Sequence, residues 1–287
     1  MTLSQVAVEP SYKAASPGRI FAATWGAFFY ARKPRRLYDA QAGAPLEMTE
    51  SSTVLNSSEV ASGVARSSDT AIRTYGLIVF DLDGVIIDSV ADIVAAARHC
   101  LHEIGSQDRS PALIRECIGG GARNLLLRCL DEDKKIHIDE AVMTFKTYYT
   151  QNCTKQTVLF PGVLDVLEYY AGKRKLALAT FKLRSATIKI LTELRVLRYF
   201  DVIVTADDVR LPKPDPECVN YILEALHCSR DAAIMVGDTP TDILTGKNAG
   251  IATCAVLYGI GTLEELKMCA PDFVIGNILE LKKLITI

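Results

Sequence analysis

The sequence lacks several features that would identify particular classes of protein. None of its apolar runs reaches the roughly 18–20 residues that a membrane-spanning helix needs. An excess of charge of one sign is also lacking, because the formal net charge is only −2 over 287 residues. A broad basic surface of the kind that binds nucleic acid is therefore not expected. The composition, 49% apolar and 23% charged, is that of an ordinary globular protein with one large or two ordinary domains.

The cysteines lack the spacing of a redox motif or of a zinc site. No CxxC pair occurs, and no group of cysteines and histidines has the spacing of zinc ligands. His99 and His102 are three residues apart on an expected helix, but no carboxylate frames them as a metal site, and we expect both at the surface or at an edge. The cysteines are scattered through apolar segments, so we expect small core residues in a reducing compartment. They are Cys100, Cys117, Cys129, Cys153, Cys218, Cys228, Cys254 and Cys269.

Residues 1–73 differ in composition from the rest of the chain. Up to position 46 there are six basic residues against two acidic ones, and the serine-rich stretch 51–69 then has the composition of a linker. The apolar segment 20–31 precedes its basic residues, which is the reverse of the order in a secretory signal. An organelle transit peptide, a peripheral membrane or partner anchor and an unstructured tail without catalytic importance remain open. We expect a cytoplasmic protein, or one in an organelle lumen or stroma if the extension is a transit peptide.

From Tyr75 onward, short apolar runs alternate with helical patterns. Continuous apolar runs are typical of strands covered on both faces, and their alternation with helices predicts a doubly wound, Rossmann-like α/β fold with a parallel sheet. One helix is expected to begin with Ser185 as its N-cap. Another should begin with Asp215 as cap and Pro216 at its first helical position. The expected strands are residues 77–80, 175–180, 201–206, 232–237 and 253–258.

A long interval separates the first two expected strands. It contains several helical patterns and no convincing strand, and it is too long for a single crossover between neighbouring strands. We therefore expect a helical cap over residues 92–157, inserted as a lid into a catalytic core formed by residues 74–91 and 158–287. The expected cap helices are residues 92–104, 124–130 and 139–149.

Conspicuous polar residues follow four of the expected strands. Ligands of open parallel sheets bind in the crevice at the carboxyl ends of the strands, so these side chains should converge there. A single aspartate after a strand is most often a turn former or a helix cap, but the coincidence at four strands favours a functional site. The residues are Asp81 and Asp83, Thr180 with Lys182 beyond it, Asp207, Asp208 and Lys213, and Asp238 and Asp242.

The order of these elements resembles the haloacid dehalogenase superfamily of phosphotransferases. The resemblance covers about residues 75–287, and the combination of its four signature stretches is highly specific. It implies a catalytic α/β core with a cap inserted after the first strand. The four stretches are DLDGV (81–85), Thr180, Lys213 in KPDP, and GDTPTD (237–242).

Within that superfamily, three further stretches are similar to phosphoglycolate phosphatases. One position departs from the pattern, because many relatives have Asn after the threonine, where this sequence has Phe181. The phosphate contact of that Asn side chain would be lost, and a backbone N–H would remain. The three stretches are DSVAD (88–92), IGGGARNLLLRCL (118–130) and DDVRLPKPDP (207–216).

The resemblance implies that Mg²⁺ is the cofactor. Asp81 and Asp238 would bind the ion by their side chains and Asp83 by its backbone carbonyl, because Mg²⁺ prefers an octahedral shell of hard oxygens. Asp242 would orient that shell. Carboxylates a few ångströms apart repel one another by about 4 kcal/mol at an effective dielectric constant near 20, and the cation would offset this repulsion.

The resemblance also assigns roles in catalysis. Asp81 would attack phosphorus and form an aspartyl phosphate. Asp83 would protonate the departing alkoxide and then take a proton from the water that hydrolyses the intermediate. Thr180 and Lys213 would hold phosphoryl oxygens and spread the developing charge. An acid at position 83 favours phosphoesters, because dehalogenases lack it and phosphonate hydrolases have Ala there.

The favoured substrate is 2-phosphoglycolate, which would be hydrolysed to glycolate and phosphate. Its carboxylate is a second anion, for which the cap offers backbone N–H groups at Gly120 and Gly121 and the guanidinium of Arg123. The alternative for Arg123 is a place on the surface of the lid without contact to substrate.

Other functions remain open at this stage. The same chemistry on pyrophosphate, a nucleotide or a sugar phosphate is the first alternative. A sugar-phosphate mutase is less favoured, because DSVAD (88–92) lacks the His that beta-phosphoglucomutases carry near this place. A non-catalytic binding module is disfavoured by the intact Asp81, Asp83, Lys213 and Asp238. The expected partner is thus a small phosphate ester, and the sequence does not indicate the oligomeric state.

Overall fold

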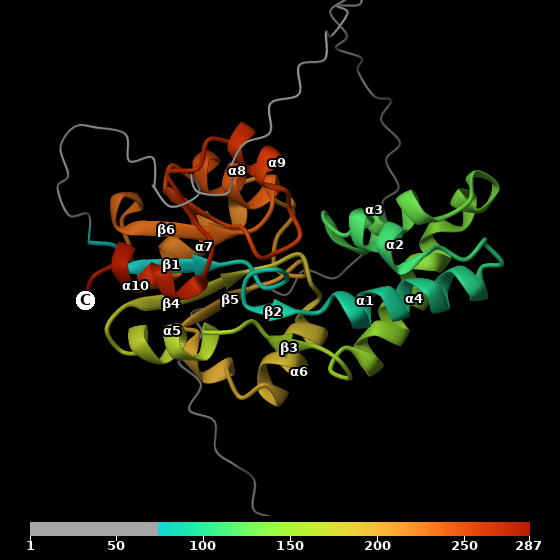
Figure 1. Ribbon diagram of the computed structural model, residues 1–287, viewed down its shortest axis with the longest axis horizontal. Coiled ribbons are helices and arrows are strands. Elements are labelled where there is room, and N and C mark those ends of the chain that lie inside the picture. Colours follow the sequence, from blue (N-terminus) through green and yellow to red (C-terminus); the bar gives the residue numbers. More distant parts are fainter. Residues whose placement is uncertain (1–73) are drawn as a thin grey trace, which may run out of the picture. The chain divides into compact units, whose positions relative to one another are not determined.

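The computed structural model describes residues 74–287 (Figure 1). The basic and serine-rich extension expected over residues 1–73, with its candidate targeting role, lies outside the described residues. None of the helices in residues 74–287 has the length and apolar character needed to cross a membrane.

Six parallel strands form the main sheet of the described residues, in the order β5-β4-β1-β6-β7-β8. From the central β1 the chain builds two strands on one side and then three on the other, as a doubly wound fold does. The predicted fold class is therefore confirmed. The strands are β1 Leu77–Phe80, β4 Lys175–Ala179, β5 Val202–Val204, β6 Ala233–Gly237, β7 Ala252–Val256 and β8 Phe273–Ile275.

Helices connect these strands and cover the sheet (Figure 1). Short 3₁₀ helices lie between strands at Leu197–Tyr199 and Arg230–Ala232, and another follows β8 at Ile278–Glu280. The helices of this part are α5 Val163–Tyr170, α6 Arg184–Glu193, α7 Glu217–Leu226, α8 Pro240–Asn248, α9 Leu263–Met268 and α10 Leu281–Leu284.

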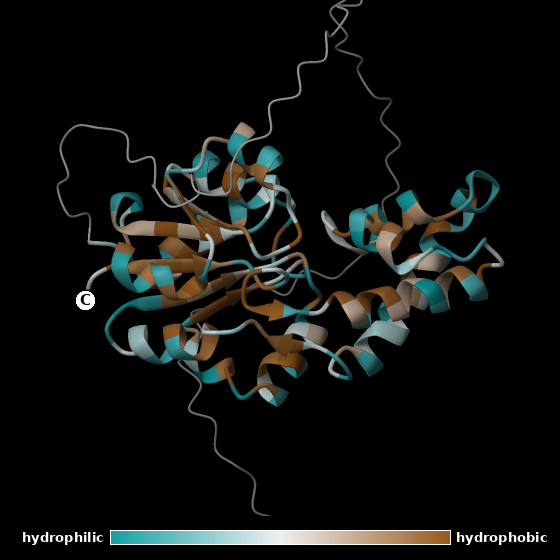
Figure 2. Ribbon diagram, in the orientation of Figure 1, coloured by the Kyte–Doolittle hydropathy of each residue, from teal (hydrophilic) through white to brown (hydrophobic). Residues whose placement is uncertain are grey.

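Strand β1 is apolar throughout because both of its faces are covered. Its four side chains are completely buried. Leu77 and Val79 join an apolar cluster with α7, whereas Ile78 and Phe80 join a second cluster with α5 and α6. Figure 2 shows the resulting band of hydrophobic strands between helices with hydrophilic outer faces. Burial on two faces fixes β1, and with it the residues that directly follow it.

The start of α6 differs from the prediction. Its first residue is Arg184 and its N-cap is Leu183, so the predicted cap Ser185 lies inside the helix and makes no cap hydrogen bond. The carboxylate of Asp207, from the loop after β5, accepts a hydrogen bond from the backbone N–H of Arg184 at 2.7 Å. A free backbone N–H at the start of α6 is thus bound by a residue from another loop, whereas the sequence suggested a cap from the helix itself.

The start of α7 lies one residue beyond the prediction. Pro216 is the N-cap rather than the first helical residue, and the helix begins at Glu217. Asp215 still accepts a hydrogen bond from the backbone N–H of Glu217, at 2.9 Å. Its carboxylate therefore serves the helix from one position farther out than an N-cap residue.

The long interval after β1 is helical. The helix α2 was not predicted, although Ser110 accepts a hydrogen bond from the backbone N–H of Leu113 as its N-cap and Pro111 begins it. Two short antiparallel strands, β2 Ile87–Asp88 and β3 Val158–Leu159, connect this region to the core. Its helices are α1 Val90–Glu103, α2 Pro111–Cys117, α3 Gly121–Cys129 and α4 Ile138–Asn152, with a 3₁₀ helix over Glu132–His137.

Asp92 joins the beginning and the end of this helical region. It is buried, and its carboxylate accepts hydrogen bonds from the backbone N–H groups of Gln156 and Thr157, both at 3.0 Å. The hydroxyl of Thr157 donates a further one at 2.8 Å. We retain residues 92–157 as the proposed extent of the cap, since its two ends are bound to each other.

Candidate active site

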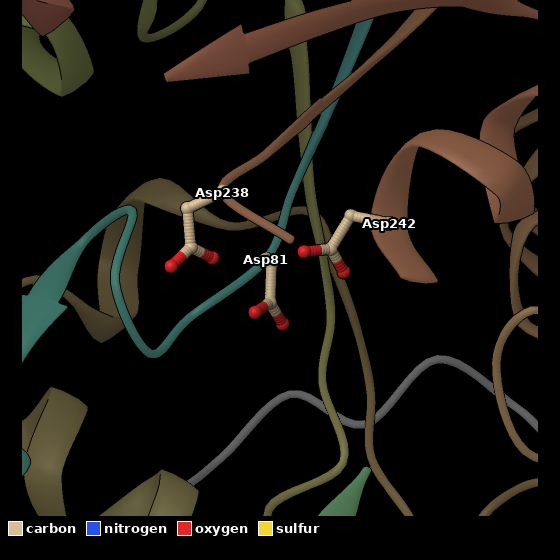
Figure 3. Close-up of side chains that lie close together, drawn as sticks. All are labelled: Asp81, Asp238 and Asp242. Carbon is tan, nitrogen blue, oxygen red and sulfur yellow. The ribbon is translucent and has the colours of Figure 1, made fainter. Parts of the chain in front are cut away.

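Three carboxylates meet at the carboxyl edge of the sheet. Asp81 directly follows β1, Asp238 directly follows β6, and Asp242 lies in the first turn of α8. The strands β1 and β6 are neighbours, and the backbone N–H of Asp81 donates to the carbonyl of Val236 at 3.0 Å. One oxygen from each of the three carboxylates lies within 4.8 Å of the others, and all three residues are buried (Figure 3).

Asp242 is held in place by the start of its own helix. One of its carboxylate oxygens accepts hydrogen bonds from the backbone N–H of Thr239 at 3.1 Å and from its hydroxyl at 2.6 Å, which forms a capping box. Gly237 allows this arrangement, because a Cβ atom at that position would lie 2.1 Å from the Cβ atom of Asp242. The other oxygen of Asp242 remains directed to the site.

Lys213 is the cation among these carboxylates. Its buried ammonium donates to Asp81 at 2.9 Å, to Asp242 at 2.6 Å and to the carbonyl of Ala179 at 3.1 Å. Burial by itself would lower the pKa of Lys213, but the charges of Asp242 and Asp81 more than offset it, and the pKa lies above its ordinary value. The side chain is therefore a permanent positive charge in the site.

Asp238 has a carboxylate oxygen without a partner. It is completely buried, and one oxygen accepts a hydrogen bond from the backbone N–H of Ile260 at 2.7 Å. Its Oδ1 atom has no hydrogen-bond partner among the described residues. Burial raises the pKa of Asp238 well above its ordinary value, and the neighbouring Asp242 and Asp81 raise it further. A buried polar atom of this kind requires an explanation.

Glycines form the wall around Asp238. A Cβ atom on Gly84 would lie 1.9 Å from Oδ2 of Asp238, and one on Gly259 would lie 2.3 Å from the same atom. A Cβ atom on Gly261 would lie 2.3 Å from the backbone carbonyl oxygen of Asp238. The backbone therefore approaches this carboxylate more closely than any side chain would allow.

The charges of the site fit a bound divalent cation. One ammonium, that of Lys213, faces the carboxylates of Asp81, Asp238 and Asp242, so two negative charges are unbalanced when all are ionised. The pKa of Asp81 is raised to about 7, because burial and the charges of Asp242 and Asp83 together outweigh the lowering effect of Lys213. Hard carboxylate oxygens are the ligands that Mg²⁺ prefers. A cation here would give the Oδ1 atom of Asp238 a partner and would offset the unbalanced charge.

Asp83 lies on the loop between β1 and β2, two residues beyond Asp81. Its carboxylate accepts a hydrogen bond from the hydroxyl of Ser89 and forms an ion pair with Lys182 at 3.0 Å. The side chain of Asp83 is 20% exposed, which makes it the more accessible of the two aspartates of DLDGV. Sequence reasoning noted Lys182 after Thr180 but gave it no role.

The loop after β4 contributes Thr180 and Phe181. Thr180 is buried, and its hydroxyl accepts a hydrogen bond from the backbone N–H of Lys182 at 3.2 Å. The ring of Phe181, at the position that departs from the superfamily pattern, has its centroid 5.1 Å from the ammonium of Lys213. At this distance the ring face attracts the cation. The side chain of Phe181 thus contacts the lysine of the site although it has no group that could donate a hydrogen bond to phosphate.

The structure does not bring Asp207 and Asp208 to the three carboxylates. Asp208 accepts hydrogen bonds from the backbone N–H of Thr205 at 2.8 Å and pairs with Arg184 at 2.5 Å. Asp207 binds the backbone N–H of Arg184. The expectation that carboxylates from the third strand join the site is therefore wrong for these two residues, which stabilise their loop and the start of α6.

The predicted substrate-binding residues of the cap lie around the start of α3. Gly120 and Gly121 have φ values of 66° and 86°, which favour glycine. Arg123 forms an ion pair with Asp139 of α4, and these side chains are 56% and 89% exposed. A different arginine reaches the core, since Arg115 of α2 donates to the carbonyl of Gly259 at 3.4 Å, beside Asp238. A role of Gly120, Gly121 and Arg123 in substrate binding stays a prediction.

Known proteins with similar sequences match this region over nearly their whole own length. The phosphoglycolate phosphatase of Aquifex aeolicus (strain VF5) is 37% identical over 209 residues, which cover 72% of this chain and 95% of that protein. The phosphoglycolate phosphatase of Vibrio cholerae is 33% identical over 220 residues, which cover 73% of this chain and 97% of that protein.

Solved structures agree with these sequence comparisons. A protein described as a predicted phosphoglycolate phosphatase from Haemophilus somnus has a TM-score of 0.67 at 25% identity, covering 73% of this chain and 97% of that one. A haloacid dehalogenase-like family hydrolase from Streptococcus pneumoniae has the same TM-score and coverage at 27% identity. The model of the family described as haloacid dehalogenase-like hydrolase matches residues 78–256. The chain belongs to the haloacid dehalogenase-like hydrolase family.

Proposed function

We propose that this protein is a magnesium-dependent phosphatase that hydrolyses 2-phosphoglycolate to glycolate and phosphate through an aspartyl phosphate. The observation that carries the proposal is the contact of Asp81 with Lys213 at 2.9 Å, beside the carboxylates of Asp238 and Asp242. The relatives from Aquifex and Vibrio support the choice of substrate, because both are named phosphoglycolate phosphatase.

The cofactor part of the proposal rests on the donor set. Asp81 and Asp238 would hold Mg²⁺ by their side chains and Asp83 by its backbone carbonyl, while Asp242 would orient the shell. When bound, the ion supplies positive charge that draws together the anionic ester and an anionic nucleophile. The unpartnered Oδ1 atom of Asp238 supports this assignment.

The first chemical step belongs to Asp81. A carboxylate oxygen of Asp81 forms a bond to phosphorus while the bond from phosphorus to the ester oxygen breaks. Lys213 orients the carboxylate and favours its ionised form, because its charge opposes the rise in the pKa of Asp81 that burial causes. Thr180 and Lys213 would donate hydrogen bonds to phosphoryl oxygens as negative charge shifts toward the leaving group.

Asp83 carries the protons of both steps. In the first, its protonated carboxyl gives a proton to the departing alkoxide of glycolate. In the second, the carboxylate takes a proton from a water molecule whose oxygen attacks phosphorus, and phosphate leaves Asp81 with its carboxylate restored. The partial exposure of Asp83 suits a group that must meet both substrate and water.

A panel of substrates tests the proposed reaction. We expect phosphate release from 2-phosphoglycolate to have a higher kcat/KM than release from pyrophosphate, a nucleotide or a sugar phosphate, and EDTA to abolish it. A higher kcat/KM on another ester would contradict the substrate and leave the chemistry intact. Absence of turnover on every ester, with magnesium present and the protein folded, would contradict the function.

Magnesium binding can be tested apart from turnover. A ligand that binds only the folded state at about 100 times its Kd stabilises it by about 2.7 kcal/mol. For a domain of this size that corresponds to a rise in Tm of about 5–10 °C. We expect Mg²⁺ to raise the Tm of the wild type and of the control Asp133→Asn, whose side chain is 75% exposed, but not that of Asp238→Asn. An equal rise in all three proteins would place the ion elsewhere.

A further inference from the structure

Lys182 is a buried lysine with two partners from different parts of the fold. It lies two residues beyond Thr180, and only 6% of its side chain is exposed. Its ammonium is 3.0 Å from the carboxylate of Asp83 and donates a hydrogen bond to the hydroxyl of Tyr149 at 2.6 Å. A buried ammonium is costly unless it is paired in this way. One side chain of the core therefore connects the proposed proton donor to a tyrosine of the cap.

Tyr149 is a fixed contact point on α4. It is 5% exposed, and its ring stacks on that of Phe145 with the centroids 5.6 Å apart. The ammonium of Lys182 also lies 4.4 Å from the ring centroid of Tyr149. Burial would lower the pKa of Lys182, but Asp83 and Tyr149 more than offset it, so the lysine stays charged. The position of the Lys182 ammonium therefore depends on the position of α4.

The backbone around Lys182 is also fixed. Its N–H donates to the hydroxyl of Thr180, and its carbonyl accepts a hydrogen bond from the N–H of Ala206 at 3.2 Å. The side chain of Lys182 therefore extends from a defined position in the loop after β4. Among the described residues, hydrogen bonds and ion pairs to the side chain of Asp83 come from Lys182 and Ser89, and of these only Lys182 reaches the cap.

We propose that Lys182 is a positioning residue: it orients the carboxyl of Asp83 toward the leaving oxygen and makes this orientation depend on Tyr149 of the cap. The inference rests on the proposed function, since it concerns the delivery of the proton to the leaving group. If Lys182 acts in this way, the carboxyl of Asp83 points to the leaving oxygen only while α4 holds the position seen in the structure. Proton donation is thus coupled to the position of the cap.

A rival role for Lys182 is binding of the substrate's second anion. An ammonium has three N–H donors, and Asp83 and Tyr149 already engage the group. A carboxylate of the substrate would have to share a buried lysine with both partners. Orientation of Asp83 is therefore the better account, and the two roles predict different kinetics.

Three probes separate these roles in the magnesium-loaded enzyme. 2-Phosphoglycolate has a poor alkyl leaving group and a carboxylate, ethyl phosphate has a poor leaving group without a carboxylate, and p-nitrophenyl phosphate has a good leaving group. We expect Lys182→Met to lower kcat on both alkyl phosphates about tenfold to hundredfold, as a misplaced catalytic group does. KM should change less than about threefold, and the loss on p-nitrophenyl phosphate should be several times smaller.

Two further variants keep the test valid if Lys182→Met folds poorly. Tyr149→Phe removes only a hydroxyl and should cause a smaller loss in kcat with the same dependence on the leaving group. Lys182→Arg retains the positive charge and should recover part of the activity on alkyl phosphates. The Tm of each variant is measured alongside, so that a loss of folded protein is not taken for a loss of turnover.

Lys189 supplies a matched control. It also connects the core to the cap, because its ammonium donates to the carbonyls of Thr150 at 3.1 Å and Gln151 at 2.8 Å. No ion pair or hydrogen bond joins it to Asp83 in the described part of the chain. Lys189→Met should therefore affect the three substrates equally, which shows what the loss of a core-to-cap lysine does without Asp83.

The outcomes are distinct. A rise in KM for 2-phosphoglycolate alone would overturn the inference in favour of carboxylate binding. Equal losses on all three substrates, as in Lys189→Met, or no loss at all, would also overturn it while the proposed function stands. Absence of turnover by the wild type on every probe would overturn both, so the two failures can be told apart.

Discussion

Gly84 has no side chain because Asp238 occupies the space where a side chain would lie. The Gly84 φ of 85° is strained for other residues, and its Cβ atom would lie 1.9 Å from one oxygen of Asp238 and 2.5 Å from its Cγ atom. The glycine of DLDGV thus serves an aspartate that lies 154 positions later in the chain, as the residue numbers 84 and 238 give. Such a relation is geometric and does not appear in the local sequence pattern.

We predict that Gly84→Ala displaces the Asp238 carboxylate and lowers kcat/KM at least about a hundredfold, the loss expected when a catalytic group is moved by about 1 Å. The variant should also lose the rise in Tm with Mg²⁺. The control is Gly172→Ala, because Gly172 has a φ of 71° and no atom within 4 Å of a Cβ there. Gly172→Ala should lower the free energy of unfolding only by the backbone strain, about 1–2 kcal/mol. Similar activity in the two variants would show that the contact with Asp238 is unimportant.

At the scale of the elements, Asp92 joins the beginning of the cap to its end. The carboxylate of this residue at the start of α1 accepts hydrogen bonds from Gln156 and Thr157, just before β3. It also lies next to β2 in sequence, so one buried side chain ties the two connections of the cap together. The position of α4, on which the orientation of Asp83 depends, rests partly on this contact.

We predict that Asp92→Asn lowers the free energy of unfolding by about 1–3 kcal/mol, because its new amide N–H₂ would face backbone donors and leave them unpaired. Urea denaturation followed by circular dichroism measures the change. Asp108→Asn is the control, since Asp108 pairs with Arg98 in an exposed ion pair, with side chains 58% and 49% exposed. Such a pair contributes about 0–1 kcal/mol. A loss for Asp92→Asn no larger than this control would remove Asp92 from the account of the cap.

Those parts of the fold that local patterns encode could be predicted from the sequence. Strands covered on both faces are continuous apolar runs, and the residues after them must meet at one edge of the sheet, which explains the placement of Asp81, Asp238 and Lys213. The strand β8 lies at the edge of the sheet with Val274 exposed, so it lacks the pattern of a strand covered on both faces. Other features depend on tertiary contacts that no local signal reveals. Lys182 is one of them, because its importance follows from Tyr149, 33 positions earlier in the chain.

The same reasoning explains the predictions that were wrong. Asp207 and Asp208 follow a strand, as Asp81 does, and the sequence pattern does not separate the two cases. The structure separates them through Arg184, whose backbone and side chain engage both carboxylates. The predicted cap Ser185 failed for the same reason, since the first N–H of α6 is already bound to Asp207.

At the scale of the whole molecule, every residue assigned to the site lies between positions 81 and 261. The contacts described for the three carboxylates, Lys213 and Asp83 are all made by residues within 74–287. We therefore predict that deletion of residues 1–70 changes kcat and KM on 2-phosphoglycolate less than about threefold. Steady-state kinetics of the two proteins at equal Tm checks this. A large loss of kcat at unchanged Tm would show that the extension contributes to the site.

The central claim is that Asp81 is the nucleophile of a magnesium-dependent phosphatase. The most direct test is the release of phosphate from 2-phosphoglycolate by the wild type and by Asp81→Asn, with saturating Mg²⁺ and with deamidation excluded by mass spectrometry. Asn is nearly isosteric with Asp but cannot displace an alkoxide. The account predicts turnover by the wild type and a loss of at least about 10⁴-fold in kcat for a variant that keeps its fold. Turnover near the wild-type rate by folded Asp81→Asn would contradict it.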